Sequence, residues 1–433
     1  MKAPCLRSIC SGLLNCDARA VSLFILLSGF PGLSCFAADG RLLSLSEAEL
    51  MALQNDTGTK KAHAQQESFK EQAVAANSWP DPKLNLGIVN LPQSFKIDQE
   101  PMTQTVVGIT QMFPPSGAVG AKSNQLLDMA DAMGHEAKNR RLLTLAAVRK
   151  SWLDVYMQHQ SLLFIKESLD VFVELIKVTQ YQYRAGRGNQ QDVIRAQLEQ
   201  NLLEDQVADL EAKYENALAV LTKWLGVERS VEELDMQFPS FAKLPSEQKI
   251  LSSLEEHPAT QIRKMRVNAA ENGVNYASSQ LHPGWAVKVQ YGFRAEDSSG
   301  NARDDFLTAM LTIDLPLFSG NRQDRMVAAS KLDVKAAQQD LDDWRRQMKM
   351  QFEKTMAVYT RANERVQLYQ GSVLPHSKQN TEATMSAYQS GVTDFNVLVR
   401  ARLTELKSQL QFVKLNVERA KAQVELLYLA AVD

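Results

Sequence analysis

The sequence lacks cysteine beyond position 35, where the last of its four cysteines stands. A mature protein without this N-terminal stretch has no thiolate for a disulfide, a zinc site or a cysteine nucleophile. An excess of basic charge is also missing, because 48 Lys and Arg face 50 Asp and Glu and leave a formal net charge of −2. Nucleic acid is therefore not an expected partner, since its phosphates attract strongly basic surfaces.

Motifs of common enzymes and metal sites are missing as well. The chain has no G-x-S-x-G, no Walker loop, no G-x-G-x-x-G and no H-E-x-x-H. Its six histidines show no metal-ligand spacing such as i, i+4 on one helix. Met102, Met112, Met129 and Met133 could attract Cu(I), but methionine at helical spacing more often fills a core. We predict no enzyme activity, no catalytic residues, no cofactor and no metal site.

Long apolar runs are confined to the N-terminus. Basic residues precede the apolar segment 20–30, and small residues follow at 34–38, which is the layout of a secretory signal. We predict a signal peptide over 1–37. Cys35 is an alternative lipid-attachment site, although Gly32 stands where such sites usually have leucine. Beyond residue 38 no run reaches the about 18 apolar residues of a membrane helix, so the mature chain is either soluble outside the cytoplasm or meets a membrane through β-strands.

The chain contains an internal repeat. The motif Tyr183-x-x-Gly186, followed by Arg195, recurs about 205 positions later as Tyr388-x-x-Gly391, followed by Arg400. We interpret residues 38–240 and 241–433 as two copies of one unit.

Each copy contains two segments with the alternation of β-strands. Apolar and polar residues alternate most clearly over 285–294 and 305–315, and more weakly over 83–91 and 104–113. Strands of this length can cross a bilayer when tilted. Four strands cannot close a membrane barrel, so a membrane role requires several chains to share one. Two ordinary hairpins packed on soluble helices remain the alternative.

Long helices follow the strands in each copy. We predict them over about 121–182 and 190–225 in the first copy, and over about 322–387 and 393–430 in the second, with a kink at Pro375. Apolar residues recur at alternating spacings of three and four, as in Leu145, Val148, Trp152 and Val155. This spacing is typical of coiled-coil packing between antiparallel helices.

Three kinds of segment are distinctive in this sequence. They are Pro-Gly-Trp at 283–285 leading into Tyr-Gly-Phe-Arg at 291–294, the strand-to-helix joint at 314–323, and the two Tyr-x-x-Gly breaks. Together they resemble the TolC family of outer membrane efflux proteins. The stretch 98–104, running into 108–114, is similar to members that accompany copper and silver efflux. The resemblance covers essentially the whole mature chain.

This resemblance implies a fold that is mainly α with β, made of two repeats, each a two-stranded membrane hairpin plus long antiparallel coiled-coil helices. In the family, three chains form a homotrimer whose four-stranded sets close one twelve-stranded β-barrel in outer membrane lipid, above an α-helical barrel in the periplasm. The implied partners are a periplasmic adaptor (membrane fusion) protein and an inner-membrane pump that supplies the energy.

The resemblance also suggests functional residues at the helix breaks. In the family these turns contact the adaptor, which points here to the residues Tyr183, Arg184, Gly186, Arg187, Tyr388 and Gly391. Positions that carry gate aspartates in well-known members hold Val397 and Arg400 here. Our hypothesis is that Asp192 or Asp394 pairs with Arg195 or Arg400 across helices and holds the channel end closed. A solvated surface pair of little energy is the competing interpretation.

The expected function is a passive exit duct of a tripartite efflux system, with heavy-metal ions preferred as cargo. Export of drugs and type I protein secretion are alternatives, because the duct itself hardly distinguishes them. A periplasmic coiled-coil scaffold with no membrane span is a second alternative.

Overall fold

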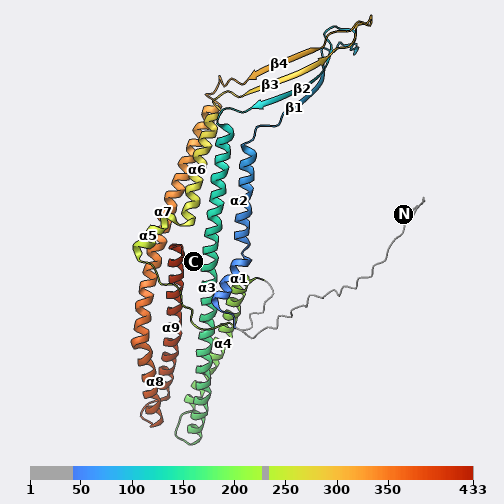
Figure 1. Cartoon of the computed structure of the whole chain (residues 1–433). Coiled ribbons are helices and arrows are strands. Elements are labelled where there is room, and N and C mark those ends of the chain that lie inside the picture. The colour runs from blue at the N-terminus through green and yellow to red at the C-terminus, as the bar shows by residue number, and fades with distance from the viewer. Residues whose placement is uncertain (1–41, 227–233, 433) are drawn as a thin grey trace, which may run out of the picture. The chain divides into compact units, whose positions relative to one another are not determined.

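The computed structural model describes residues 42–226 and 234–432 (Figure 1). The predicted signal peptide, 1–37, and the possible lipidation site Cys35 lie outside the described residues. From Leu42 onward the chain forms one compact unit, so the two repeats share one body.

The order of elements repeats along the chain. The first repeat contains α1 (Leu45–Asn55), α2 (Thr57–Ala76), β1 (Lys83–Val89), β2 (Gln104–Phe113), α3 (Ala118–Arg184) and α4 (Gln190–Leu225). The second contains α5 (Glu247–Glu256), α6 (Pro258–Ser279), β3 (Trp285–Phe293), β4 (Phe306–Ile313), α7 (Gln323–Leu368), α8 (Leu374–Gln389) and α9 (Phe395–Leu429). The predicted fold class of two repeats with strand hairpins and long helices is confirmed.

In the first repeat, two shorter helices pack against successive parts of the long helix α3 (Figure 1). Ser123 near the start of α3 donates a hydrogen bond to the carbonyl of Ala73 in α2 at 2.9 Å. Further along, Lys166 of α3 forms an ion pair with Glu211 of α4 at 2.9 Å. The second repeat follows the same plan, with α6 and α9 both packed on α7. Because α3 also contacts α6 and α9, it joins the two repeats.

Local capping explains where the first helices begin. Ser44 accepts a hydrogen bond from the backbone N–H of Glu47, whose carboxylate accepts one from the Ser44 backbone in return. Asp56 caps α2 by accepting from the N–H groups of Gly58 and Thr59. These side chains satisfy N–H groups that have no partner inside a helix.

The apolar stripe predicted along α3 is buried. Val148, Trp152 and Val155 pack with residues of α1 and α4, and further along α3 Ile165 and Phe172 pack with residues of α4 and α9. Burial of this seam is the main favourable contribution to helix association. Among the described residues, no helix is both long enough and apolar enough to cross a lipid bilayer.

The helix predicted over about 322–387, in the second repeat, is not one continuous rod with a kink. It divides into α7 and α8, joined by a π-helical turn at Tyr369–Val373. The backbone N–H of Leu374 donates to the carbonyl of Tyr369, five residues earlier. Pro375 has no N–H, and its ring would collide with the carbonyl one turn back. The wider turn thus accommodates the proline next to an otherwise continuous helical path.

Smaller differences lie at element ends. The helix expected from about 121 begins at Ala118. β1 ends at Val89 rather than 91, because Asn90 adopts a left-handed backbone with a φ of 56°. β4 spans Phe306–Ile313 rather than 305–315.

Candidate functional site

The strands form one four-stranded antiparallel sheet in the order β1-β2-β3-β4. Its central pair, β2 and β3, joins the two repeats, with Phe113 opposite Trp285. Since α2 leads into β1 and β2 leads into α3, the sheet end with these aromatic residues adjoins the helices. The loops 90–103 and 294–305 lie at the other end (Figure 1).

The sheet has one apolar face and one polar face, because successive side chains of a strand point to opposite sides. The apolar face carries Leu84, Leu86, Ile88, Val107, Ile109, Val287, Val289, Leu307, Leu311 and Ile313. The other face, called the polar face here, carries all the charged side chains of the strands and most of the other polar ones, but it also includes apolar residues. Its polar residues are Lys83, Asn85, Gln104, Thr110, Lys288, Gln290, Thr308 and Thr312, and its larger apolar residues are Val89, Val106, Met112, Phe306 and Met310. In the single chain Leu86 and Leu307 are 69% and 74% exposed. So large an exposed apolar face requires lipid or a partner to cover it.

Aromatic residues mark both ends of the apolar face. At the helical end Phe113 stacks on Trp285 with ring centroids 4.0 Å apart, and Trp79 meets Phe113 edge-on at 5.0 Å. At the loop end Tyr291 and Phe293 lie 4.7 Å apart. Aromatic side chains at two levels with an apolar band between them are typical of strands that cross a bilayer.

The loops at the far end contact each other. Arg294 and Arg303 of the second loop donate to the carbonyls of Pro101 and Glu100 at 3.1 and 3.3 Å. The stretch 98–104, which resembles metal-efflux members, begins in the first of these loops, where Met102 is exposed. Within residues 42–226 and 234–432, no group of three or more His, Cys, Asp or Glu side chains could hold a metal ion.

The two Tyr-x-x-Gly motifs form the same helix-ending turn. Gly186 and Gly391 adopt φ values of 69° and 73°, which only glycine reaches at low cost. In the first turn Arg187 N–H donates to the carbonyl of Gln182 at 2.9 Å, and in the second Val392 N–H donates to Ala387 at 2.9 Å. These hydrogen bonds satisfy the last carbonyls of α3 and α8 and reverse the chain into α4 and α9.

The paired turns place their tyrosines differently. Tyr388 is 8% exposed, and its hydroxyl donates to Oε1 of Gln182 at 2.7 Å, which links the turns of the two repeats. Its ring lies 5.6 Å from that of Phe395. Tyr183 instead is 48% exposed. Two residues with the same motif therefore differ in role, one packed between the turns and one available to a partner.

A shared hollow between the turns contains two acidic side chains, Asp192 and Asp394. Partial burial raises the pKa of Asp192 above its ordinary value, and the negative charge of Asp394 raises it further, against a backbone hydrogen bond from Asn189. Burial, and then the charge of Asp192, likewise raise the pKa of Tyr388. The turns thus bring like charges together at their contact.

The predicted aspartate–arginine pairs do not form within the described chain. Arg195 pairs with Glu199 of its own helix at 2.8 Å, because residues four apart on a helix are neighbours. Arg400 is exposed, and no ion pair to it forms in the part of the chain that the structure describes. A pair between subunits stays a prediction. Arg184 and Arg187 are both exposed at the first turn.

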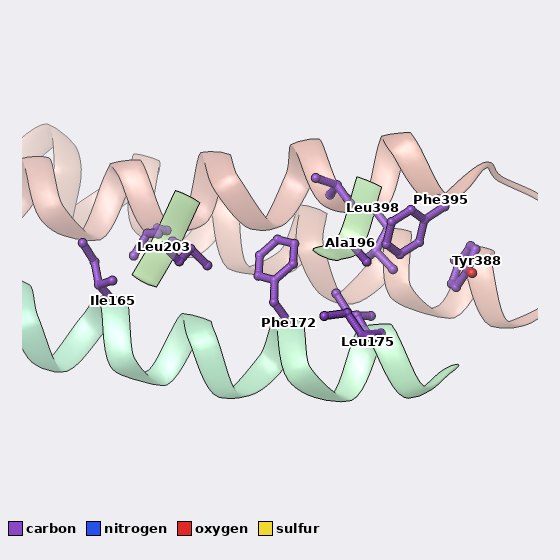
Figure 2. Close-up of a cluster of buried hydrophobic side chains, with 11 residues drawn as sticks. Ile165, Phe172, Leu175, Ala196, Leu203, Tyr388, Phe395 and Leu398 are labelled. Atoms are coloured by element: carbon purple, nitrogen blue, oxygen red, sulfur yellow. The ribbon is translucent and has the colours of Figure 1, made fainter. Parts of the chain in front are cut away.

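A hydrophobic cluster behind the turns holds the two hairpins together. Figure 2 shows Phe172 and Leu175 of α3 pointing toward Phe395 and Leu398 of α9. Ala196 and Leu203 of α4 complete the contact, and Phe172 is fully buried. Sequence reasoning did not assign Gln182 or Phe395 to this site, because their contacts join repeats far apart in the chain.

Comparisons with known proteins agree with this geometry. The model of the outer membrane efflux protein family matches residues 50–227 and 250–431. The chain belongs to this family. No curated protein matches the sequence.

Solved structures of outer membrane channels share the fold of this efflux protein. CusC, described as forming a transmembrane channel, is similar with a TM-score of 0.77 and 14% identity, over 90% of this chain and 92% of that one. The CmeC outer membrane channel of Campylobacter jejuni has a TM-score of 0.75 and 14% identity, over 89% and 85% of the two chains. The open state of the Neisseria gonorrhoeae MtrE outer membrane channel has a TM-score of 0.70 and 16% identity, over 90% and 89%.

Family membership decides three of the sequence predictions. The efflux protein resides in the outer membrane, its helices form the periplasmic part of the fold, and it is a transport component rather than an enzyme. The scaffold alternative, which has no membrane span, is thereby excluded.

Proposed function

We propose that this efflux protein is the passive exit duct of a tripartite system, in which three copies share one barrel. The observation that carries the proposal is the four-stranded sheet with one apolar face and two free edges, continued by long antiparallel helices. A conduit of this kind needs no catalytic residue, because the energy comes from an inner-membrane pump.

The free edges are β1 and β4, each of which is paired on one side only among the residues that the structure describes. An open edge in lipid leaves backbone N–H and C=O groups without partners, at a cost of several kcal/mol for each group. Pairing of β4 in one copy with β1 in the next removes every edge when the ring closes. Three copies supply twelve strands, an even number as in bacterial barrels.

The helices next to the sheet support the same closure. They contact one another in the sequence α2, α3, α6 and α7, so α2 and α7 are the outer members. Val74 on α2 and Met326 and Leu332 on α7 are exposed large apolar side chains. Contact between α2 of one copy and α7 of the next would bury these side chains.

The turns 185–189 and 390–394 are proposed contacts for the periplasmic adaptor. Tyr183, Arg184, Arg187 and Val392 are exposed there, which provides apolar surface together with positive charge. Tyr388 and Gly391 complete the site indirectly, since the buried tyrosine and the left-handed glycine set the shape of the second turn.

We further propose that Asp192 and Asp394 control the closed end of the duct. The other charged or proton-binding groups lining the same hollow are Tyr181, Tyr388, Lys177 and Arg187. Packing raises the pKa of Asp192, so the packed turns hold the proton more tightly than separated turns do. When the pH falls through the raised pKa, Asp192 binds a proton and the packed turns become more stable. This stabilisation is lost when the pH rises above the raised pKa.

Replacing Asp192 by Asn is expected to reduce the pore conductance at pH 7 by about twofold and to flatten its pH dependence, because a neutral side chain removes the repulsion. Single-channel recordings in planar bilayers between pH 7 and pH 4 measure this. Asp205→Asn, the same change at an exposed position of α4, is the control and should behave as the wild type. If the conductance of Asp192→Asn kept the pH dependence of the wild type, the Asp192 carboxylate would not be the group that controls the gate.

For the cargo, we propose heavy-metal ions, on the resemblance of 98–104 and 108–114 to copper and silver efflux members. Drugs or a secreted protein are the other outcomes of the test. A deletion strain should become more sensitive to copper or silver salts while its sensitivity to dyes and detergents stays the same. The reverse pattern would assign drug export.

The shared barrel predicts the mass and location of the mature protein. Membrane fractionation should place it in the outer membrane, and mass determination in detergent should give three times the mass of one chain. A monomer in detergent would contradict the shared barrel, because free edges of β1 and β4 cannot persist in lipid.

A further inference from the structure

We propose that the polar face of the sheet makes the barrel lumen prefer anions, through a cationic row formed by Lys83 and Lys288. This inference rests on the proposed shared barrel, and it concerns the chemical class of the cargo. The apolar face must contact lipid, so the polar face lines the lumen.

The two lysines lie in one cross-strand row. Lys83 of β1 is opposite Thr110 of β2, Thr110 is opposite Lys288 of β3, and Lys288 is opposite Met310 of β4. Directly opposed residues point to the same face of a sheet. With neighbouring strands about 4.8 Å apart, the two Cα atoms are separated by about 10 Å.

Nothing within the strands neutralises this row. β1, β2, β3 and β4 contain two lysines and no Asp or Glu at all. Neither lysine forms an ion pair with any residue of the described ranges. Thr110, which lies between them, accepts a hydrogen bond from Nδ2 of Asn85 at 2.8 Å. The neighbouring positions are therefore neutral, either polar as Thr110 and Asn85 or apolar as Met310.

Acidic residues lie beyond the strands. Asp314 follows Met310 by four residues, about 13 Å along an extended chain. This separation exceeds the Debye length of about 8 Å at physiological ionic strength. The other acidic residues near the strands belong to the two far loops, and they are Asp98, Glu100, Glu296, Asp297, Asp304 and Asp305. Asp81 is the exception, because it precedes Lys83 by two residues and offsets part of its charge. A positive zone thus lies between two acidic mouths, repeated in every copy of the trimer.

The row favours anionic solutes over bare cations. Low-dielectric walls concentrate the potential of like charges in a narrow passage and enrich ions of opposite sign. A soft metal ion such as Cu(I) would then cross this zone as an anionic chloride or thiolate complex rather than as a free cation.

The test is the reversal potential of purified trimers in planar bilayers under a KCl gradient, for the wild type and for Lys83→Gln/Lys288→Gln. We expect the ratio of chloride to potassium permeability to fall by about twofold in the double variant. The shift should shrink when the salt rises from about 0.1 M to about 1 M, since the Debye length falls from about 10 Å to about 3 Å. Lys249→Gln, on the exposed surface of α5, changes the net charge by one unit outside the strands and should leave the ratio unchanged.

The outcomes separate this inference from the proposed function. If the pores had the same ion preference with and without the two lysines, the inference about the cationic row would be refuted, but the proposed function as a duct would not. Absence of any pore from correctly folded wild-type protein would overturn the duct itself. Lys83→Glu/Lys288→Glu provides a second measurement, in which the preference should move further toward potassium.

Discussion

Val289→Arg is expected to abolish assembly of this efflux protein in the outer membrane. Val289 is the central residue of β3 on the apolar face, where it is opposite Ile109 and Ala309 and 46% exposed in the single chain. Arginine on the lipid face near the bilayer midplane costs about 2 to 4 kcal/mol, and a trimer carries this cost in every copy. Immunodetection of trimer in outer membrane fractions measures the result.

The matched control is the next residue along the strand. Gln290→Arg places the same side chain on the polar face, opposite Gly108 and Thr308. We expect normal amounts of trimer, because a lumen-facing charge remains in water. Loss in Gln290→Arg alone would show that the two faces of the sheet have been assigned wrongly. Equal loss in both variants would show that the effect of arginine does not depend on contact with lipid.

Phe172→Ala is expected to loosen the paired turns. The Phe172 side chain is fully buried between α3 and its neighbours (Figure 2). Truncation of a buried phenylalanine costs about 3 to 5 kcal/mol, because it removes apolar contacts and leaves a cavity. In detergent, the midpoint of thermal unfolding followed by circular dichroism should fall by about 5 °C. Single-channel conductance should rise, since the cluster positions Tyr388 and Phe395 at the paired turns, which we propose as the closed end of the duct.

Val178→Ala serves as the control on the same helix. Val178 lies on α3 between Phe172 and the turn, but it is exposed. Its truncation should change the free energy of unfolding by no more than about 0.5 kcal/mol. If both variants unfolded at the wild-type temperature, the cluster would not be what holds the two hairpins together.

The strand faces and the helix breaks could be predicted from the sequence. Alternation with a period of two assigns each strand residue to a face before any pairing is known, as it does for Val289 and Gln290. Gly186 and Gly391 end their helices because of a local backbone preference that no distant contact needs to supply.

Several features of the site could not be predicted in this way. The hydrogen bond between Tyr388 and Gln182 joins residues from different repeats, and identical motifs give no sign that one tyrosine is buried and the other exposed. Arg195 was expected to pair across helices, but Glu199 on its own helix is closer. The π-helical turn accommodates Pro375, but a proline in the sequence indicates only that the helix is disturbed and not that the disturbance is a wider turn.

By itself, the sequence determined the repeat, the element types, the two faces of each strand and the resemblance to the efflux family. These depend on interactions between residues close in the chain, whose period and composition are visible without a structure. Only the tertiary structure decided the row that places Lys83 and Lys288 on either side of Thr110, the charged hollow of Asp192 and Asp394, and the cluster around Phe172. Each of these arises where residues distant in the chain meet, and packing of the two repeats against each other selects those meetings.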